Sequence, residues 1–391
     1  MKSYQSLIDV LNQTIEKNKE ELFALNCDIA DHPEISGEEY ETSKKIARLL
    51  TEHGFQVELP FAGMDTAFRA IAGSNNHKHK VAILAEYDAL PDVGHACGHC
   101  LSGSISCLAA IGAKELQDEL DTDIHVLGTP MEETCGGKIT MVNAGVFQDY
   151  DMALMVHMSD HNMVRMRAQA LDAMFFEFHG KAAHASANPW DGINALNAAQ
   201  LMLHGVDMLR QHLKDGTRMH GVIHKGGVVP GIVPDEAEIE MYVRSTDSKY
   251  LAETVAKVDN CAAGGALATG CTWDKWRRDP VFESMKSNDT GIVAMEETYG
   301  DLGLPLNGDP NEIFGSTDCG NVSWICPAFH PLLQLAPTGI PIHSRDFETY
   351  VRTDKANKCL EDGAKIISYQ IAKIFSDPEK IQAMKDDFAK A

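Results

Sequence analysis

The stretch VAILAEYDALPDVGHACGHC, residues 81–100, joins a buried-strand pattern to a cluster of residues that can bind a metal ion. Val81–Ala85 is an uninterrupted apolar run of strand length, which is typical of a parallel strand covered on both faces. His95–Cys100 follows and places thiols and imidazoles on a glycine-containing loop, a donor set suited to zinc or a similar ion. Open α/β sheets carry their sites at the carboxyl ends of such strands. The stretch therefore predicts an α/β fold with a metal site at the edge of its sheet.

Strand-like and helical patterns alternate on both sides of this stretch. We expect strands at 55–59, 66–72, 81–86, 123–128 and 152–157, and helices at 4–30, 37–53, 102–114 and 137–145. Strands that alternate with helices predict a mainly parallel sheet flanked by helices on both faces.

The pattern changes near residue 168. Strand, helix, strand, strand, helix and strand patterns follow at 170–181, 191–214, 218–225, 236–246, 248–268 and 271–278. That order is typical of a ferredoxin-like α+β sandwich. A chain of 391 residues is long enough for two domains. We therefore expect a first domain over 1–168 and 281–391, interrupted by an inserted domain over 169–280.

The composition excludes several classes of function. The formal net charge of −23, with no basic stripe to offset it, argues against a nucleic-acid partner. Apolar runs are too short to span a membrane, and the first residues lack the apolar core of a secretion signal, so we expect a cytoplasmic protein without a membrane partner. The ten cysteines are scattered, as reduced packing thiols are.

Further candidate ligands end other predicted strands. The pair Glu132–Glu133 follows the strand at 123–128, where adjacent carboxylates are costly unless a cation compensates them. One carboxylate can bind the ion while its neighbour removes a proton from water; the alternative is a solvated acidic loop. His157 and His343 each end an apolar segment, although a histidine in such a place is more often a core residue. That four separate segments end on such residues favours a metal centre.

With these motifs the chain resembles the two-metal peptidases and deacylases that include aminoacylase, acetylornithine deacetylase and carboxypeptidase G. The resemblance is strongest to their amidohydrolase branch, with hippurate hydrolase, the indoleacetyl-amino-acid hydrolases and the aminobenzoyl-glutamate hydrolases. The matching motifs cover essentially the whole chain in the family's order: Glu86–Pro91, His95–His99, Glu132–Glu133, His157, Gly180–Ser186, Asp191–Ala195, Ser316–Ser323 and His343. The resemblance implies a zinc-exopeptidase-like catalytic domain with an inserted lid.

The resemblance also implies the role of each site residue. Two divalent ions (zinc, manganese or cobalt) would be bound by five residues, with Cys97 as the bridge: Cys97, His99, Glu133, His157 and His343. Glu132 would be the general base, and Asp88 would orient a ligand. His184, usually delivered from the partner subunit of a homodimer, would stabilise the oxyanion.

Two positions depart from the family pattern. Cys100 stands where the branch usually has Asp or Asn, and a packing role is expected for it. Gly231 stands where relatives usually have an Asn that holds substrate across the dimer.

Arg244 is a candidate for binding the substrate carboxylate; the alternative is a solvated surface arginine.

The sequence thus predicts a metal-dependent amidohydrolase that cleaves the amide bond of an N-acyl amino acid or a small dipeptide. One alternative makes Cys97 a nucleophile with His99 as its base, but two residues on one loop suit that pair poorly and leave Glu132–Glu133 unexplained. A second alternative is a non-catalytic metal-binding or ligand-sensing protein. Glu132 argues against it, since such a protein has no need of a base that binds no metal.

Overall fold

Two larger sheets organise the chain in the computed structural model, which describes residues 3–73, 76–309 and 312–390. Each of these sheets belongs to one of two compact units. Unit 1 comprises Met1–Met166, Met285–Glu312 and Asp318–Ala391. Unit 2 comprises Arg167–Ser284 and Ile313–Thr317.

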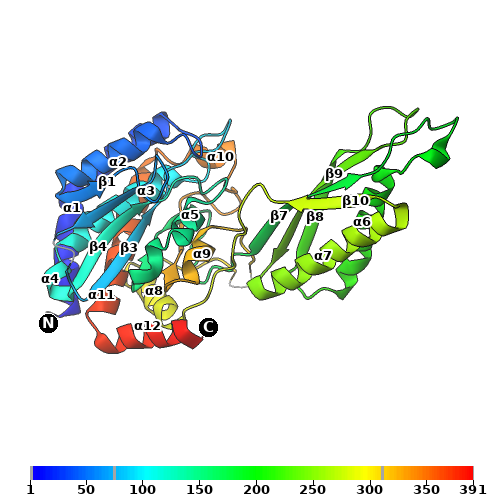
Figure 1. Ribbon diagram of the computed structural model, residues 1–391. Coiled ribbons are helices and arrows are strands. Elements are labelled where there is room, and N and C mark those ends of the chain that lie inside the picture. Colours follow the sequence, from blue (N-terminus) through cyan, green and yellow to red (C-terminus); the bar gives the residue numbers. More distant parts are fainter. Residues whose placement is uncertain (1–2, 74–75, 310–311, 391) are drawn as a thin grey trace. The chain divides into compact units, whose positions relative to one another are not determined.

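The main sheet of unit 1 has six strands in the order β1-β2-β4-β3-β5-β11. Their bounds are β1 (Phe55–Glu58), β2 (Phe68–Ala72), β3 (His79–Ala85), β4 (Thr122–Gly128), β5 (Met152–Leu154) and β11 (Ala328–Phe329). The pairs β4-β3, β3-β5 and β5-β11 are parallel, whereas β1 and β2 form an antiparallel edge. This confirms the predicted α/β class and its mainly parallel sheet (Figure 1).

Helices cover both faces of this sheet. Those of unit 1 are α1 (Tyr4–Asp31), α2 (Tyr40–Glu52), α3 (His99–Lys114), α4 (Gln117–Leu120), α5 (Gly137–Asn143), α8 (Asp289–Asp301), α9 (Cys319–Ser323), α10 (Arg345–Glu348), α11 (Asp354–Phe375) and α12 (Pro378–Lys390), together with the 3₁₀ turn Val146–Asp149. Alternate residues of β3 enter two different hydrophobic clusters. Val81 and Ile83 pack with α1, α3 and α11, and Ala82 and Leu84 pack with α5 and α9. A strand buried on both faces has to be apolar throughout, as Val81–Ala85 is.

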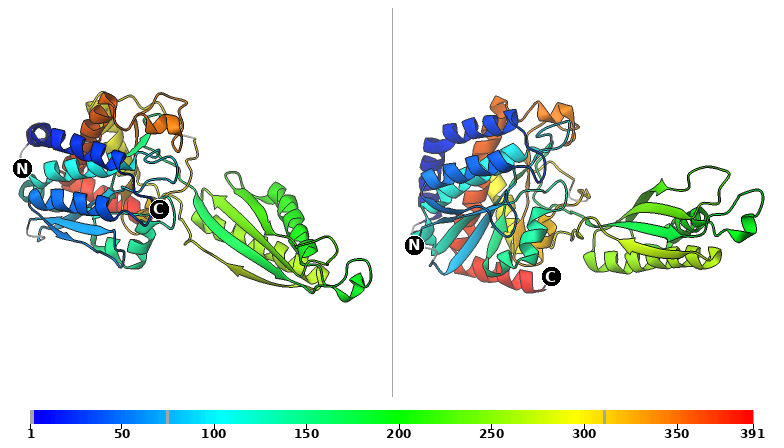
Figure 2. Two further views of the ribbon diagram at one scale, coloured as in Figure 1. Left: turned by 90° about the horizontal axis from the view of Figure 1, so that it is seen from above. Right: turned by 45° about the horizontal axis from the view of Figure 1, so that its top comes forward.

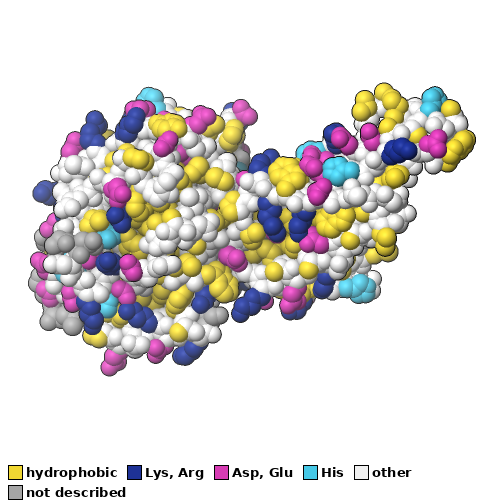
Figure 3. Space-filling model, in the orientation of Figure 1, with side chains coloured by type: hydrophobic (Ala, Val, Ile, Leu, Met, Phe, Trp, Pro, Cys, Tyr) yellow, Lys and Arg dark blue, Asp and Glu magenta, His cyan; other side chains and the backbone are white. Residues whose placement is uncertain are grey.

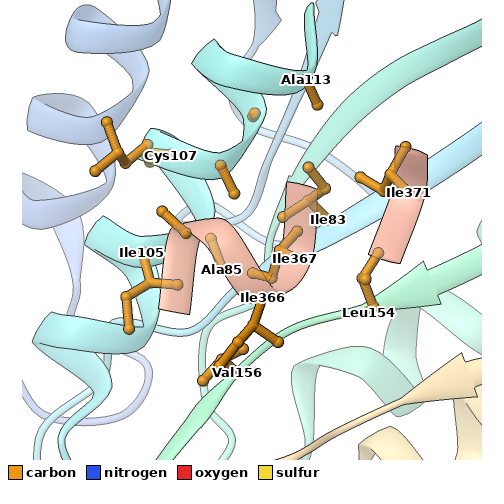
Figure 4. Packing of buried hydrophobic residues seen from close by; sticks show 14 of the residues in the cluster. Ile83, Ala85, Ile105, Cys107, Ala113, Leu154, Val156, Ile366, Ile367 and Ile371 are labelled. Carbon is orange, nitrogen blue, oxygen red and sulfur yellow. The ribbon is translucent and has the colours of Figure 1, made fainter. Parts of the chain in front are cut away.

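The first of these clusters is shown at close range in Figure 4. Ile83 and Ala85 of β3 lie among side chains of α3, such as Ile105, and of α11, such as Ile367. Burial of the isoleucine side chains, each contributing about 1.5–3 kcal/mol, fixes α3 and the loop before it against the carboxyl end of β3.

The predicted strand at 152–157 is divided in the structure. β5 ends at Leu154, and a second short strand, β6 (His157–Ser159), pairs in parallel with β12 (Leu332–Gln334). Pro331 lies between β11 and β12, and because proline has no backbone N–H it interrupts the pairing. His157 therefore begins a strand, instead of ending one as the sequence suggested.

Unit 2 holds an antiparallel sheet in the order β10-β7-β9-β8, which is the order of a ferredoxin-like sandwich. Its elements are β7 (Ala170–His179), the 3₁₀ turn Pro189–Asp191, α6 (Ala195–Leu209), the 3₁₀ turn Arg210–His212, β8 (Arg218–Lys225), β9 (Glu236–Ser245), α7 (Ser248–Thr269) and β10 (Thr272–Trp276). One hydrophobic cluster joins both helices to a single face of the sheet (Figure 2). The helix predicted from residue 191 begins at Ala195, where the Asn194 side chain caps it by accepting a hydrogen bond from the Asn197 N–H.

On the face shown in Figure 3, Lys and Arg side chains are interspersed with Asp and Glu. In the described part of the chain, the structure shows no helix with the length and apolar character of a membrane span.

Candidate metal centre

Five predicted ligands come together in unit 1, from four segments of the chain. Cys97 lies on the loop that ends in α3, and His99 is the first residue of that helix. Glu133 lies on the loop between β4 and α5, and His157 is the first residue of β6. His343 lies just before α10. Cys97, His99 and His157 are buried, whereas the side chain of His343 is half exposed.

Cys97 is the residue that two groups of candidate ligands have in common. Its Sγ lies 3.4 Å from His157 Nε2 and 3.3 Å from His343 Nε2. His343 Nε2 is in turn 3.2 Å from Glu133 Oε1. Two groups of donor atoms, each with all members within 4.8 Å of one another, result: Cys97, His99 and His157 in one, and Cys97, Glu133 and His343 in the other.

The spacing of these donors fits a divalent cation. Metal–ligand bonds of about 2.0–2.3 Å at tetrahedral angles separate two donors by roughly 3.3–3.8 Å. Among the described residues, the buried atoms His99 Nε2 and Glu133 Oε1 also lack any hydrogen-bond partner. Buried polar atoms are rarely left unsatisfied, so these two atoms, one in each donor group, indicate places for cations.

Hydrogen bonds turn the metal-binding nitrogen of two histidines toward the centre. His99 Nδ1 donates to Asp88 Oδ1 at 2.8 Å, and His157 Nδ1 donates to the Met158 carbonyl oxygen at 2.8 Å. In each neutral ring the proton then sits on Nδ1, and Nε2 keeps the lone pair that a metal needs. His330, which the sequence analysis did not single out, stacks on His157 with a centroid distance of 5.1 Å.

The electrostatics of the centre oppose a free thiolate. Burial raises the pKa of Cys97 well above its usual range, with the Glu133 charge adding to the effect. A thiol nucleophile needs a lowered pKa, which burial opposes at Cys97. For His99, burial disfavours the charged ring, but nearby acidic groups, the carboxylates of Asp88 and Glu86 among them, outweigh it and raise the pKa well above its usual range. A bound cation would favour the thiolate and the neutral imidazole instead.

Buried carboxylates hold the Glu132–Glu133 loop. Asp88 Oδ2 accepts hydrogen bonds from the Glu133 N–H at 3.0 Å and from Ser36 Oγ at 2.6 Å. Glu39, which the sequence analysis did not identify, accepts one from the Met131 N–H at 3.0 Å. Glu132 lies between these anchored positions, and its carboxylate is within 4.8 Å of the donor atoms of His99 and Glu133.

Two backbone positions adopt left-handed conformations beside the ligands. Gly98, between Cys97 and His99, has φ 84°, and a Cβ there would lie 2.7 Å from the Met158 Cβ. His343 has φ 65°, and its N–H donates to the Ala96 carbonyl oxygen at 2.9 Å. A non-glycine residue in this conformation is strained, and such strain is typical of functional positions.

Glu132 also borders a second group of charges. Glu86, Glu132 and Asp318 have carboxylate oxygens within 4.8 Å of one another. The ammonium of Lys138, which the sequence analysis did not single out, contacts Glu86 Oε1 and Asp318 Oδ1 at 2.6 Å each. Burial, with the charges of Glu86, Asp318 and Glu133, raises the pKa of Glu132 well above its usual range. In the sequence, the feature that could have pointed to Lys138 is its position directly after Gly136–Gly137, at the start of a predicted helix.

The predicted substrate residues lie in unit 2. His184 is exposed, and its Nδ1 accepts hydrogen bonds from the Ser186 and Ala187 N–H groups at 3.3 and 3.2 Å. Nε2 therefore carries the proton in the neutral ring. Arg244, on β9, donates to Ser316 Oγ at 2.8 Å and forms no ion pair within the described residues. Gly231 is exposed, and its carbonyl oxygen accepts from the Ala185 N–H at 2.9 Å, beside His184.

Cys100 lies in the hydrophobic core of unit 1 and not among the ligand atoms. It is fully buried within the cluster that contains α1, α3 and α11. Burial raises the pKa of its thiol to about 12. These surroundings are those of a packing thiol.

Fold and site together define an α/β protein with a candidate centre for two metal ions at the edge of a mainly parallel sheet. The family model for Peptidase family M20/M25/M40 matches residues 82–366. The chain therefore belongs to this peptidase family and is a hydrolase of peptide or amide bonds.

Individual relatives agree over nearly the whole chain. The chain is 32% identical to the Xaa-Arg dipeptidase of Mus musculus, over 96% of this chain and 90% of the relative. It is 27% identical to one of the subunits of the p-aminobenzoyl-glutamate hydrolase of Escherichia coli K12, over 98% and 95% of the two chains. The structure of the Bacillus subtilis YXEP protein, described as a dinuclear metal-binding peptidase of the M20 family, superimposes with a TM-score of 0.72 at 20% identity, covering 91% of this chain and 98% of that one.

Proposed function

We propose that the protein is a two-metal amidohydrolase that cleaves the amide bond of a small dipeptide or an N-acyl amino acid. The observation that carries the proposal is that Cys97 belongs to both donor groups, one with His99 and His157 and one with Glu133 and His343. A thiolate shared in this way suits two ions held side by side. Zinc, manganese and cobalt are all compatible with this mixture of sulfur, nitrogen and oxygen donors.

Glu132 is the proposed general base. Two bound ions would polarise the scissile carbonyl and make a nearby water molecule more acidic. Glu132 binds neither ion in this proposal, so its carboxylate is available to accept the proton of the attacking water. It then delivers that proton to the nitrogen of the leaving amine. Asp88 holds both His99 and the Glu133 backbone, and so fixes the two ligands on either side of this base.

Unit 2 supplies the proposed contacts to the substrate. His184 would donate its Nε2–H to the carbonyl oxygen as negative charge develops there, an interaction worth roughly 10²–10³ in turnover. Arg244 would bind the substrate carboxylate, because its guanidinium is not paired with an acidic residue within the described part of the chain.

The names of the relatives support the substrate class. An Xaa-Arg dipeptidase and a p-aminobenzoyl-glutamate hydrolase both act, by name, on compounds with an amino acid joined through an amide. We also propose a homodimer. β8 is the edge strand of the unit 2 sheet and exposes Val222 and Ile223, and an apolar edge strand favours pairing with a second copy.

Hydrolysis of a substrate panel by metal-loaded protein tests the proposed function. The panel holds Xaa-Arg and β-alanyl dipeptides together with acetyl-, benzoyl- and aminobenzoyl-amino acids, each assayed with zinc, manganese and cobalt. We expect hydrolysis of at least one class, and a fall in kcat of about 10²–10⁴-fold in Glu132→Gln without loss of metal. A fully metal-loaded protein that hydrolyses none of the panel would contradict the proposal.

A further inference from the structure

A buried lysine joins three segments that surround the Glu132 loop. Glu86 directly follows β3, Lys138 is in the first turn of α5, and Asp318 precedes α9. Lys138 Nζ contacts the carboxylates of Glu86 and Asp318 at 2.6 Å each, and the Lys138 N–H donates to Asp318 Oδ2 at 2.9 Å. All three side chains are fully buried.

Close backbone approach holds the loop against this network. A Cβ at Gly137 would lie 2.0 Å from the Pro130 carbonyl oxygen, and one at Gly136 would lie 3.1 Å from the Asp318 Cβ. The loop that carries Glu132 therefore closes on itself just before Lys138. Lys138 thus directly follows a tightly packed turn that also carries Glu132.

The carboxylates around Lys138 indicate its role in this network. Glu86, Glu132 and Asp318 place carboxylate oxygens within 4.8 Å of one another, an arrangement that could itself hold a cation. Lys138 supplies that positive charge from within the chain. Its ammonium has three N–H donors, two of which are directed to Glu86 and Asp318.

Glu86 extends the network to the metal centre. Its Oε2 lies 3.4 Å from His99 Nε2 and has no hydrogen-bond partner among the described residues. Without the lysine, Glu86 would be an uncompensated buried charge facing a ligand, and Asp318 would be a second beside the base. Breaking such a pair by removing one partner is costly, so both carboxylates would have to move.

We propose that Lys138 is a positioning residue for hydrolysis, because its ammonium clamps Glu86 and Asp318 and thereby fixes the loop on which Glu132 meets the attacking water. This inference rests on the proposed function of Glu132. It assigns to Lys138 no contact with substrate or metal.

The test compares Lys138→Met with a matched control, Lys373→Met, in the full-length metal-loaded protein. Lys373 is also buried and ion-paired, with Asp301 at 2.9 Å, but it lies in the last turn of α11 and outside the site. For Lys138→Met we expect kcat to fall on the order of 10²-fold, the effect of displacing the Glu132 carboxylate by about 1 Å. We expect KM and bound metal to stay unchanged, because the Glu133 N–H remains anchored by Asp88. For Lys373→Met we expect kcat and KM to stay as in the unaltered protein.

Metal content is measured separately from activity, by mass spectrometry of the dialysed protein, to distinguish an effect on the ligands from an effect on the base. If Lys138→Met loses metal together with turnover, the lysine supports the ligands and not the base, and the proposal is overturned. An unchanged kcat in Lys138→Met also overturns it.

A second variant covers the case in which Lys138→Met does not fold. Lys138→Met/Asp318→Asn removes one buried positive and one buried negative charge together. We expect it to fold and bind metal while kcat stays reduced; full activity in it would overturn the proposal. A failure of the proposed function can be told apart from a failure of this proposal, because the unaltered protein would then hydrolyse none of the substrate panel.

Discussion

At the scale of single residues, two cysteines three positions apart have opposite surroundings. Cys97 Sγ lies among imidazoles, 3.3–3.4 Å from two histidine nitrogens. Cys100 is fully buried among apolar side chains of the core. The turn of chain between them, with Gly98 in a left-handed conformation, directs one thiol to the sheet edge and the other into the interior.

This contrast gives a matched pair of substitutions. Cys97→Ser replaces the thiol proposed to bind both ions by a hydroxyl, a poorer ligand, and we expect the affinity for zinc to fall by at least about 10²-fold. Cys100→Ser places a hydroxyl in the core and should cost about 1–3 kcal/mol of stability while zinc affinity is retained. Titration calorimetry and thermal unfolding of both variants measure the two effects. Equal zinc affinity in the two variants would remove Cys97 from the centre.

At the scale of elements, the loop between β4 and α5 is shaped by close packing. Gly137 has no room for a Cβ, because the Pro130 carbonyl oxygen would lie 2.0 Å away. The same loop carries Glu132 and Glu133, so the turn and the chemistry depend on one short segment.

Gly137→Ala should therefore damage metal binding more than it damages the fold. We expect a loss of about 1–3 kcal/mol of stability in the metal-free protein, and zinc affinity reduced at least about tenfold as Glu133 is displaced. The control is Gly300→Ala on α8, where a Cβ meets nothing within 4 Å. That substitution should stabilise the helix by about 0.5–1 kcal/mol and leave zinc affinity unchanged.

The central strand β4 carries a buried histidine that makes stability depend on pH. Burial lowers the pKa of His125 to about 4, below its value of about 6.5 in the unfolded chain. The unfolded state thus binds a proton at a higher pH than the folded state does. The stability that the neutral ring contributes is complete above pH 6.5 and is lost as the pH falls toward 4, by up to about 3 kcal/mol.

As the pH falls through this range, we expect the free energy of unfolding of His125→Gln to decrease less than that of the unaltered protein. The exposed His204 on α6 is the control, since its replacement by Gln changes no buried group. Denaturant unfolding at pH 4, 5, 6 and 7 gives the free energies. Parallel pH profiles for the His125 variant and the unaltered protein would show the pKa argument to be wrong.

The sequence predicted the elements that carry strong local patterns. The apolar run Val81–Ala85 indicated the buried central strand, and the alternation in residues 236–246 indicated β9. The division of β5 from β6 was not predicted, because it depends on Pro331 in a distant partner segment. Lys138 was also missed, since only the fold brings Glu86 and Asp318, far apart in the chain, to the same ammonium.

At the scale of the whole molecule, the proposed ligands all belong to one unit. Cys97, His99, Glu133, His157 and His343 lie in unit 1, whereas His184 and Arg244 lie in unit 2. Metal bound only to the folded state stabilises the unit that holds it, by about 2.7 kcal/mol per site when free metal is a hundred times the dissociation constant.

Adding zinc to the metal-free protein should therefore protect the amides of unit 1 and leave those of unit 2 unchanged. Hydrogen exchange followed by mass spectrometry of peptic fragments gives this comparison without substrate. We expect the largest increase in the fragment that spans residues 129–137. Protection of α6 and α7 equal to that of unit 1 would show that metal binds elsewhere or acts on both units.

The proposed function requires that two cations share Cys97 while Glu132 remains free for proton transfer. Anomalous diffraction from crystals of the zinc-loaded protein tests it most directly. We predict two peaks, each about 2.3 Å from Cys97 Sγ, with Glu132 bonded to neither ion. A single peak, or a pair of peaks not joined by Cys97, would contradict the proposed function.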